Sequence, residues 1–136
     1  DGDNGYRLSN EKTFDIYVLH CLKAARARLL SGNITLNCLN TEYTFNSFTL
    51  ESVLRLGKTF TDDSLVGKMK DYYVLNLYNF KNLEILLENN LLYETWYLLP
   101  FACWFEAATN PHINKKLKLN YCKFHLMFLG HFFYKI

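Results

Sequence analysis

The sequence predicts a mostly helical domain with one small strand or hairpin region, and three observations indicate this fold class. Apolar residues recur at helical spacing over most of the 136 residues. One segment, residues 34–45, alternates apolar and polar side chains as a strand does. The chain is 50% apolar and 17% aromatic, which excludes an intrinsically disordered protein and supplies a core for one domain. An all-helical bundle is the alternative fold.

We expect a single compact domain over residues 1–136. Residues 1–10 are polar and contain glycine, so we expect a loose lead-in there. Residues 11–78 form a helix–strand–helix part, and residues 79–136 form a helical C-terminal part. The first helix is predicted over residues 13–30, where Ser31 and Gly32 end it. Its apolar face consists of Phe14, Val18, Leu22, Ala25 and Leu29.

The strand or hairpin region and two further helices follow this first helix. The alternating residues of the strand region are Ile34, Leu36, Cys38, Tyr43 and Phe45. A helix over residues 49–59 begins at Thr49, a favourable N-cap residue. Residues 61–64 supply cap residues and acids for a second helix that reaches about residue 77. Helical spacing predicts that this second helix turns one face inward, with Leu65, Met69, Tyr72 and Tyr73 on it.

Helical segments are predicted for the C-terminal part as well. Asn79 is expected to cap a short helix that ends at residues 89–90. A helical region over residues 91–108 contains Pro100, which predicts a kink or two pieces. Two adjacent sides of this region are apolar, so we expect it to lie between layers or against a partner. Residues 110–111 form a turn, and a helix is preferred over strands beyond about residue 117.

The surplus of aromatic residues between positions 72 and 105 suggests both a core and a protein interface. Tyr and Trp are favoured anchors of protein interfaces. A domain of this size has difficulty burying all of them. The candidate interface residues are Tyr93, Trp96, Tyr97, Phe101 and Trp104.

Charge is distributed unevenly along the chain. Residues 1–106 hold all 13 acidic residues, whereas residues 107–136 hold five lysines and no acid. The candidate basic patch consists of Lys115, Lys116, Lys118 and Lys123. A basic end of this kind can contact phosphate or an acidic partner. Five lysines are few for a nucleic-acid footprint, so a solvated helix face is the simpler interpretation.

The residue pattern contains no recognisable catalytic signature. No Cys lies in a Cys-x-x-Cys pair, and no glycine-rich phosphate loop or nucleophile elbow is present. Cys122, His125 and His131 could ligate zinc, but their aromatic surroundings favour a core role. We therefore expect a protein that is not an enzyme and that has neither a metal nor a cofactor. Cysteines in apolar surroundings suit free buried thiols in a reducing compartment.

The spacing of residues 53–73 resembles the last helix pair of a BTB/POZ domain. The matching positions are Leu54, Gly57, Phe60, Leu65, Met69, Tyr72 and Tyr73. Residues 76–83 resemble the start of the BACK helices that often follow, so the resemblance covers mainly residues 50–87. Upstream of these residues, two alternative alignments with the family pattern are possible. Residues 20–26 are similar to an early helix of the family, or residues 29–36 are similar to a later strand entry.

This resemblance implies a non-enzymatic BTB-like adaptor that self-associates or docks a partner such as a cullin scaffold, without a cofactor. The aromatic surplus independently favours a protein–protein interaction. The alternative is an all-helical, Bcl-2-like regulator that binds an amphipathic partner helix. A second alternative is nucleic-acid contact through the basic C-terminal end. No apolar run is long enough for a membrane span. Because the cysteines do not suggest a disulfide framework, we expect an intracellular protein, cytoplasmic or nuclear.

Overall fold

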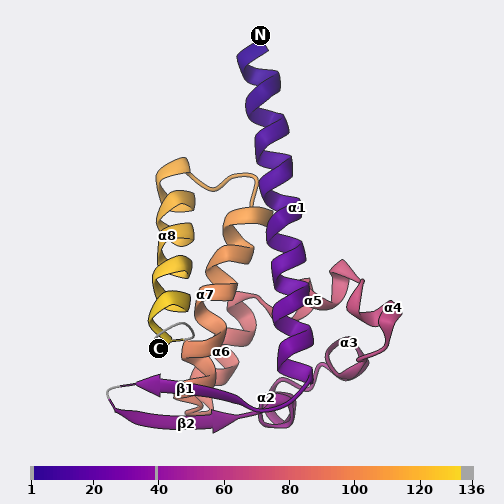
Figure 1. Cartoon of the computed structure of the whole chain (residues 1–136), viewed down its shortest axis with the longest axis vertical. Coiled ribbons are helices and arrows are strands. Elements are labelled where there is room, and N and C mark those ends of the chain that lie inside the picture. The colour runs from indigo at the N-terminus through magenta and orange to yellow at the C-terminus, as the bar shows by residue number, and fades with distance from the viewer. Residues whose placement is uncertain (1, 39, 133–136) are drawn as a thin grey trace.

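The computed structural model describes the backbone of residues 2–38 and 40–132, and the side chains of residues 15–37 and 40–123. Within these ranges the chain is mostly helical with one two-stranded hairpin (Figure 1), which confirms the predicted fold class. The elements in chain order are α1 (Gly2–Leu30), β1 (Ile34–Cys38), β2 (Thr41–Phe45), α2 (Ser47–Leu54), α3 (Lys58–Thr61), α4 (Leu65–Lys68), α5 (Asp71–Leu77), α6 (Phe80–Glu88), α7 (Leu92–Thr109) and α8 (Lys115–Phe132).

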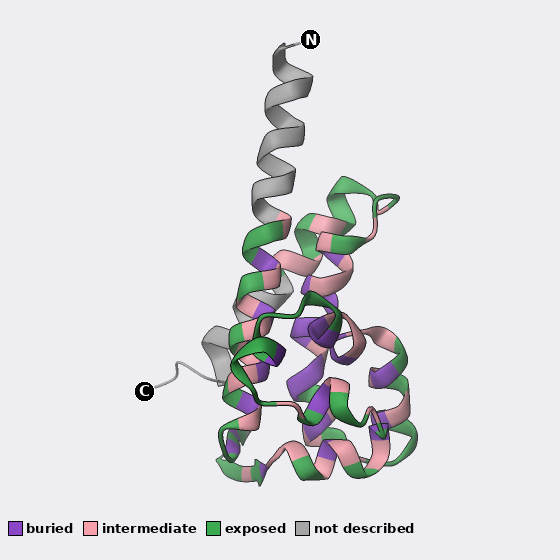
Figure 2. Ribbon diagram, turned by 90° about the vertical axis from the view of Figure 1, so that its right-hand side faces the viewer, coloured by how far each residue is buried: buried purple, intermediate pink, exposed green. Residues whose placement is uncertain are grey.

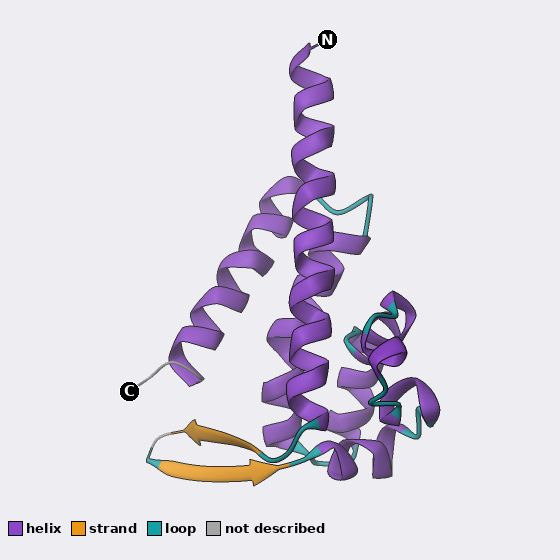
Figure 3. Ribbon diagram, turned by 45° about the vertical axis from the view of Figure 1, so that its right-hand side comes forward, coloured by secondary structure: helices purple, strands orange, loops and turns teal. Residues whose placement is uncertain are grey.

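The hairpin forms where the alternating pattern predicts it. Its strands pair antiparallel, with Ile34 opposite Phe45. Both of these side chains are buried, whereas the Thr35 and Thr44 hydroxyls lie 3.0 Å apart on the exposed face. Asn40 in the turn has a φ of 67°, which asparagine tolerates better than most residues. The hairpin lies at one end of α1 (Figure 3).

Helix α1 is longer than the sequence predicts. It begins at Gly2, so the prediction of a loose lead-in over residues 1–10 is wrong. Extending a helix adds one hydrogen bond for each residue fixed, and no proline interrupts the chain before residue 100. The N-terminal turns of α1 extend past the other helices (Figure 1). Val18, Leu22 and Leu29 are buried on its predicted apolar face.

Residues 47–77 form four short helices instead of the two predicted ones. The Asn46 carboxamide oxygen accepts hydrogen bonds from the backbone N–H groups of Phe48 at 3.0 Å and Thr49 at 3.3 Å, so Asn46 rather than Thr49 caps α2. Helix α2 ends at Leu54 because Arg55 is left-handed, with a φ of 51°. The segment predicted as one helix up to about residue 77 is divided into α4 and α5.

The helices of the C-terminal part follow the prediction more closely. The Asn79 side chain accepts a hydrogen bond from the Asn82 N–H at 2.9 Å and caps α6, as expected. Helix α7 continues through Pro100 in one piece, so Pro100 does not divide it. A proline removes one intrahelical hydrogen bond, and packing on several sides of α7 keeps the helix intact. Helix α8 confirms the preference for a helix beyond residue 117.

Helix α7 lies at the centre of the packing, as its two apolar sides predict. It packs against α1, α6 and α8. An aromatic cluster surrounds it, in which the ring of Tyr97 lies 5.3 Å from that of Phe45 and 5.2 Å from that of Phe101. Buried residues gather in this interior, while the outer turns are exposed (Figure 2). Within the described part of the chain, no helix has the length and apolarity needed to cross a membrane.

Candidate protein-docking surface

Four large apolar side chains that are close in the sequence are exposed on α4, at its C-cap and at the start of α5. Leu65 is 84% exposed, Val66 69%, Met69 72% and Tyr72 63%. Leu65, Met69 and Tyr72 follow one another at intervals of four and three residues. We call these four residues the stripe. Helix α4 lies on the opposite side of the molecule from α8 (Figures 1 and 3).

The stripe corrects the prediction that Leu65, Met69, Tyr72 and Tyr73 face inward, because only Tyr73 is buried. These residues have the spacing of one helix face, but they do not lie on one helix, because α4 ends at Lys68 and the chain turns before α5 begins. Helix α5 then buries a different face that includes Tyr73, Val74 and Leu77. One signal in the sequence points to exposure: Met69 lies between two lysines, a poor setting for a core residue.

Arg26 of α1 fixes the segment that precedes the stripe. Its side chain is 1% exposed, and its Nη2 donates to the backbone oxygens of Phe60 at 3.0 Å and Asp62 at 2.6 Å, with Thr59 O at 3.5 Å. Carbonyl groups at the end of a helix lack intrahelical donors, and a cation satisfies them well. Burial lowers the pKa of Arg26, yet a guanidinium keeps its charge at neutral pH.

The carboxylate of Asp62 ties α3, α4 and α5 together. Its Oδ1 accepts the Ser64 N–H at 3.0 Å, and its Oδ2 accepts the Tyr73 hydroxyl at 3.2 Å. The same carboxylate covers Gly67, where an added Cβ would lie 2.7 Å from it. Hydrogen bonds from Ser64, and then the one from Tyr73, lower the pKa of Asp62. The exposed stripe is therefore carried on a corner that buried and polar contacts hold in place.

Three lysines lie on or beside the short helices that carry the stripe. Lys58, Lys68 and Lys70 are all exposed, and we call them the rim. The Nζ of Lys70 lies 5.1 Å from the centre of the Tyr73 ring, which is a cation–π distance. Asp71 is paired with Lys23 at 2.5 Å, whereas Asp62 and the exposed Asp63 keep their negative charge, so the three lysines leave a small positive excess. The surface therefore suits a partner that is apolar and negatively charged.

A pocket of about 170 Å³ lies close to this corner. Its lining comes from α1, α2, the end of α3 and the segment that follows α3, and includes Leu30, Phe48 and Asp63. A helix has a diameter of about 10 Å with its side chains, so a pocket of this size does not hold one. It offers no groove of the kind that the Bcl-2-like alternative requires.

The candidate interface residues chosen from the sequence differ in how far the structure buries them. Tyr97, Phe101 and Trp104 are buried and belong to the core. Tyr93 is half-buried and stacks on Tyr43 of the hairpin, with ring centres 4.0 Å apart. Trp96 is partly exposed on α7. The sequence pattern could not separate these cases, because the neighbouring elements decide which faces of α7 are covered.

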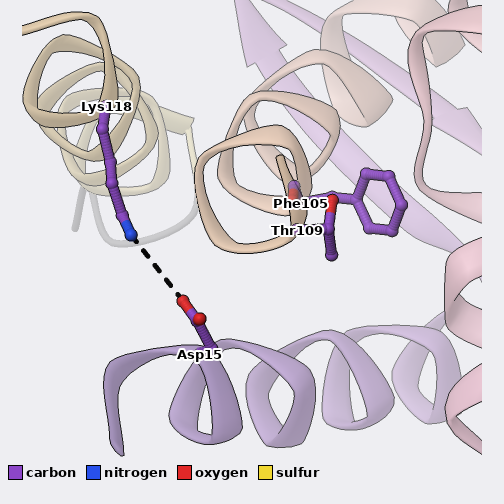
Figure 4. A network of polar contacts seen from close by, with 4 residues as sticks. All are labelled: Asp15, Phe105, Thr109 and Lys118. Atoms are coloured by element: carbon purple, nitrogen blue, oxygen red, sulfur yellow. Dashed lines mark hydrogen bonds and ion pairs between the residues drawn. The ribbon is translucent and has the colours of Figure 1, made fainter. Parts of the chain in front are cut away.

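The candidate basic patch lies on α8. Lys115, Lys116 and Lys123 are exposed, whereas Lys118 is half-buried and its Nζ lies 3.8 Å from Asp15 Oδ1 on α1. Figure 4 shows this ion pair between α8 and α1, with Phe105 and Thr109 of α7 nearby. The Thr109 hydroxyl donates a hydrogen bond to the Phe105 carbonyl oxygen at 2.8 Å. Lys118 therefore contributes to the packing of two helices, and the other three lysines are solvated.

A buried carboxylate and a buried pair of tyrosine hydroxyls in the core were not predicted. Glu94 is fully buried, and apart from an interaction with Tyr43 its carboxylate has no hydrogen-bond partner among the described residues. Burial, the charge of Glu94 and its hydrogen bond raise the pKa of Tyr43. The hydroxyls of Tyr78 and Tyr97 form a buried hydrogen bond of 3.0 Å, and burial raises the pKa of both above the usual tyrosine value.

The cysteines that the structure describes are free thiols. Cys103 is buried, and Cys21 and Cys122 are half-buried. Burial raises the pKa of Cys103 to about 11, which makes it a poor nucleophile near neutral pH. Among the described residues, no three His, Cys, Asp or Glu side chains are grouped so that they could hold a metal ion. The side chains of His125 and His131 lie outside those residues.

No protein-family model, curated protein or solved structure matches this chain.

Proposed function

We propose that this chain is a non-enzymatic protein-interaction domain that docks another protein on the stripe. The observation that carries the proposal is the exposure of Leu65, Val66, Met69 and Tyr72 on a corner held by Arg26 and Asp62. Contiguous exposed apolar residues with a polar rim are typical of interaction sites. A corner fixed by buried contacts loses little conformational entropy when a partner binds.

The stripe is large enough to drive binding of moderate strength. Burying a Val, Leu or Met side chain contributes about 1.5–3 kcal/mol, so covering these four partly exposed side chains contributes about 4–8 kcal/mol. Association costs at least several kcal/mol, which leaves a weak to moderate affinity unless the charged rim adds to it. These values fit a reversible interaction rather than a permanent complex.

The BTB/POZ resemblance supports an adaptor of the same kind. The stripe lies within residues 53–73, which carry that resemblance, and the segment is helical as the resemblance implies. The sheet among the described residues has two strands, whereas a multi-stranded sheet would favour this family over a helical bundle. Membership of the BTB/POZ family stays a prediction, and the docking function does not depend on it.

Site-specific photo-crosslinking tests the proposal. A photoreactive phenylalanine analogue replaces Leu65 in one variant and Leu119 in another, and each protein is irradiated in an extract of the cells that express it. Leu119 is also an exposed leucine but lies on α8, away from the stripe. We expect a discrete protein adduct from position 65 and none from position 119.

A second change within the stripe provides the specificity control. Met69→Asp is expected to remove the adduct formed from position 65, with an unchanged melting temperature because Met69 makes little contact with the core. Equal crosslinking from positions 65 and 119, or an adduct that survives Met69→Asp, would contradict the proposal.

A further inference from the structure

A second exposed surface of this chain carries the apolar and acidic groups that the stripe requires. It lies at the turn from α6 to α7 and consists of Glu84, Leu87, Glu88 and Leu92, which we call the acidic corner. Leu87 is 54% exposed and Leu92 53%, and both glutamates are exposed. On α6, Glu84, Leu87 and Glu88 are neighbours on one face, because residues three and four apart lie side by side.

The charge of the acidic corner is opposite to that of the stripe. Residues 82–114 contain four glutamates and no aspartate, lysine or arginine. Of these glutamates, Glu94 is buried and Glu106 accepts a hydrogen bond from Asn110 at 2.9 Å, so Glu84 and Glu88 carry the exposed negative charge. Lys81, which is also exposed, precedes Glu84 by three residues on α6, so the acidic corner keeps a small negative excess. Lysines of the rim stand on both sides of Met69, in the middle of the stripe.

We propose that the occupant of the stripe is a second copy of this chain, which docks its acidic corner there. This inference rests on the proposed docking function of the stripe. Apolar side chains of Leu87 and Leu92 would cover Leu65 and Met69, while Glu84 and Glu88 would face Lys68 and Lys70. A single chain cannot make this contact with itself, since all eight side chains are exposed in it.

The contact is heterologous, which means that each copy uses a different surface. Helix α4 packs against α1, whereas α6 packs against α2 and α7, so the two surfaces belong to different parts of the molecule. A copy that has docked its acidic corner still presents its own stripe. Such contacts extend into open chains, or close into a ring if the rotation between copies allows it. We therefore expect a size distribution that grows with concentration rather than a single dimer.

Variants that reverse the charge of either surface test this pairing. The three proteins are the wild type, Lys68→Glu/Lys70→Glu and Glu84→Lys/Glu88→Lys, studied by sedimentation velocity at low salt from about 10 µM to 500 µM, the range of weak association. We expect the sedimentation coefficient of the wild type to rise with concentration. Each variant alone should remain monomeric, because its two surfaces then have the same sign. An equimolar mixture of the variants should associate again.

Two controls separate this pairing from general charge effects. Lys115→Glu/Lys116→Glu changes the net charge by the same amount on α8 and should leave association unchanged. Salt of about 0.5 M should weaken the association, because the Debye length falls below 5 Å. Circular dichroism melting confirms that every variant is folded.

Three results would overturn the pairing. They are a wild type that is monomeric over the whole concentration range, variants that associate as the wild type does, and a mixture that fails to associate. None of these decides the docking function itself, which the crosslinking from position 65 tests separately. An adduct of position 65 with a different protein, together with a monomeric wild type, would retain the docking function and reject self-association.

Discussion

Replacing Arg26 by methionine should destabilise the fold and release the corner that carries the stripe. Methionine is unbranched and replaces the apolar stem of arginine up to about the position of Nε, so the substitution removes mainly the guanidinium. The Phe60 and Asp62 carbonyl oxygens then lose the cation that donates to them at 3.0 and 2.6 Å. The ring of Tyr73 loses the same cation, 5.0 Å from its centre.

The magnitude follows from these contacts. Hydrogen bonds to a charged group contribute about 1.5–3 kcal/mol each, so the two shorter bonds contribute about 3–6 kcal/mol. The contact between Arg26 Nη2 and Thr59 O is 3.5 Å long and adds little to this sum. The Nε of Arg26 has no partner among the described residues, and removing this buried donor recovers about 1–3 kcal/mol. We expect a net loss of about 2–4 kcal/mol, a large part of the stability of a small domain.

Urea unfolding of Arg26→Met measures the loss, and Arg28→Met is the matched control. Arg28 lies two residues further along α1 and donates from Nη2 to Asn33 O at 2.9 Å, but it is exposed. Its replacement should therefore cost less than about 1 kcal/mol. Amide hydrogen exchange over residues 60–70 should accelerate in Arg26→Met alone. Equal unfolding free energies for the two variants would refute the role of Arg26 as the anchor of this corner.

Three further predictions concern the core. Tyr97→Phe removes the hydrogen-bond partner of the buried Tyr78 hydroxyl and should lower the free energy of unfolding in urea by about 1–3 kcal/mol. If the double variant Tyr78→Phe/Tyr97→Phe loses the sum of the two single losses, the two hydroxyls are not coupled. Glu94→Leu should raise the melting temperature by several degrees, because it removes a buried carboxylate whose one polar partner among the described residues is Tyr43. A lower melting temperature would show that the contact with Tyr43 outweighs the cost of burying the carboxylate. Because the pKa of Cys103 is raised to about 11, its thiol stabilises the fold fully below the unfolded pKa of about 8.5 and loses this contribution as the pH rises toward 11. Cys103→Ala should therefore show a smaller loss of stability than the wild type over this pH range, and parallel curves would contradict the assignment.

Local signals in the sequence predicted much of the fold. The alternation over residues 34–45 and the cap at Asn79 act within a few residues, so they could be identified without the structure. The exposure of the stripe could not be identified from residue spacing, because its spacing equals that of a buried helix face, and only the lysines beside Met69 point to exposure. Whether such a face is covered depends on the turn between α4 and α5 and on Arg26, which is more than 30 residues from the carbonyl groups it binds. The same applies to α7, where the packing of α1, α6 and α8 determines which aromatic rings are buried.

Gly67 gives the stripe an unusual pattern of mutational tolerance. Its neighbours Val66 and Lys68 are exposed, so most substitutions at these two positions should leave the fold intact. A methyl group at position 67 would displace the Asp62 carboxylate, which two hydrogen bonds hold in place. In a saturation-mutagenesis map of folding, position 67 should therefore be less tolerant than its two neighbours. Tolerance of Gly67 to alanine and larger residues would show that the carboxylate moves aside easily, and variants of this position would then alter the shape of the stripe without unfolding the chain.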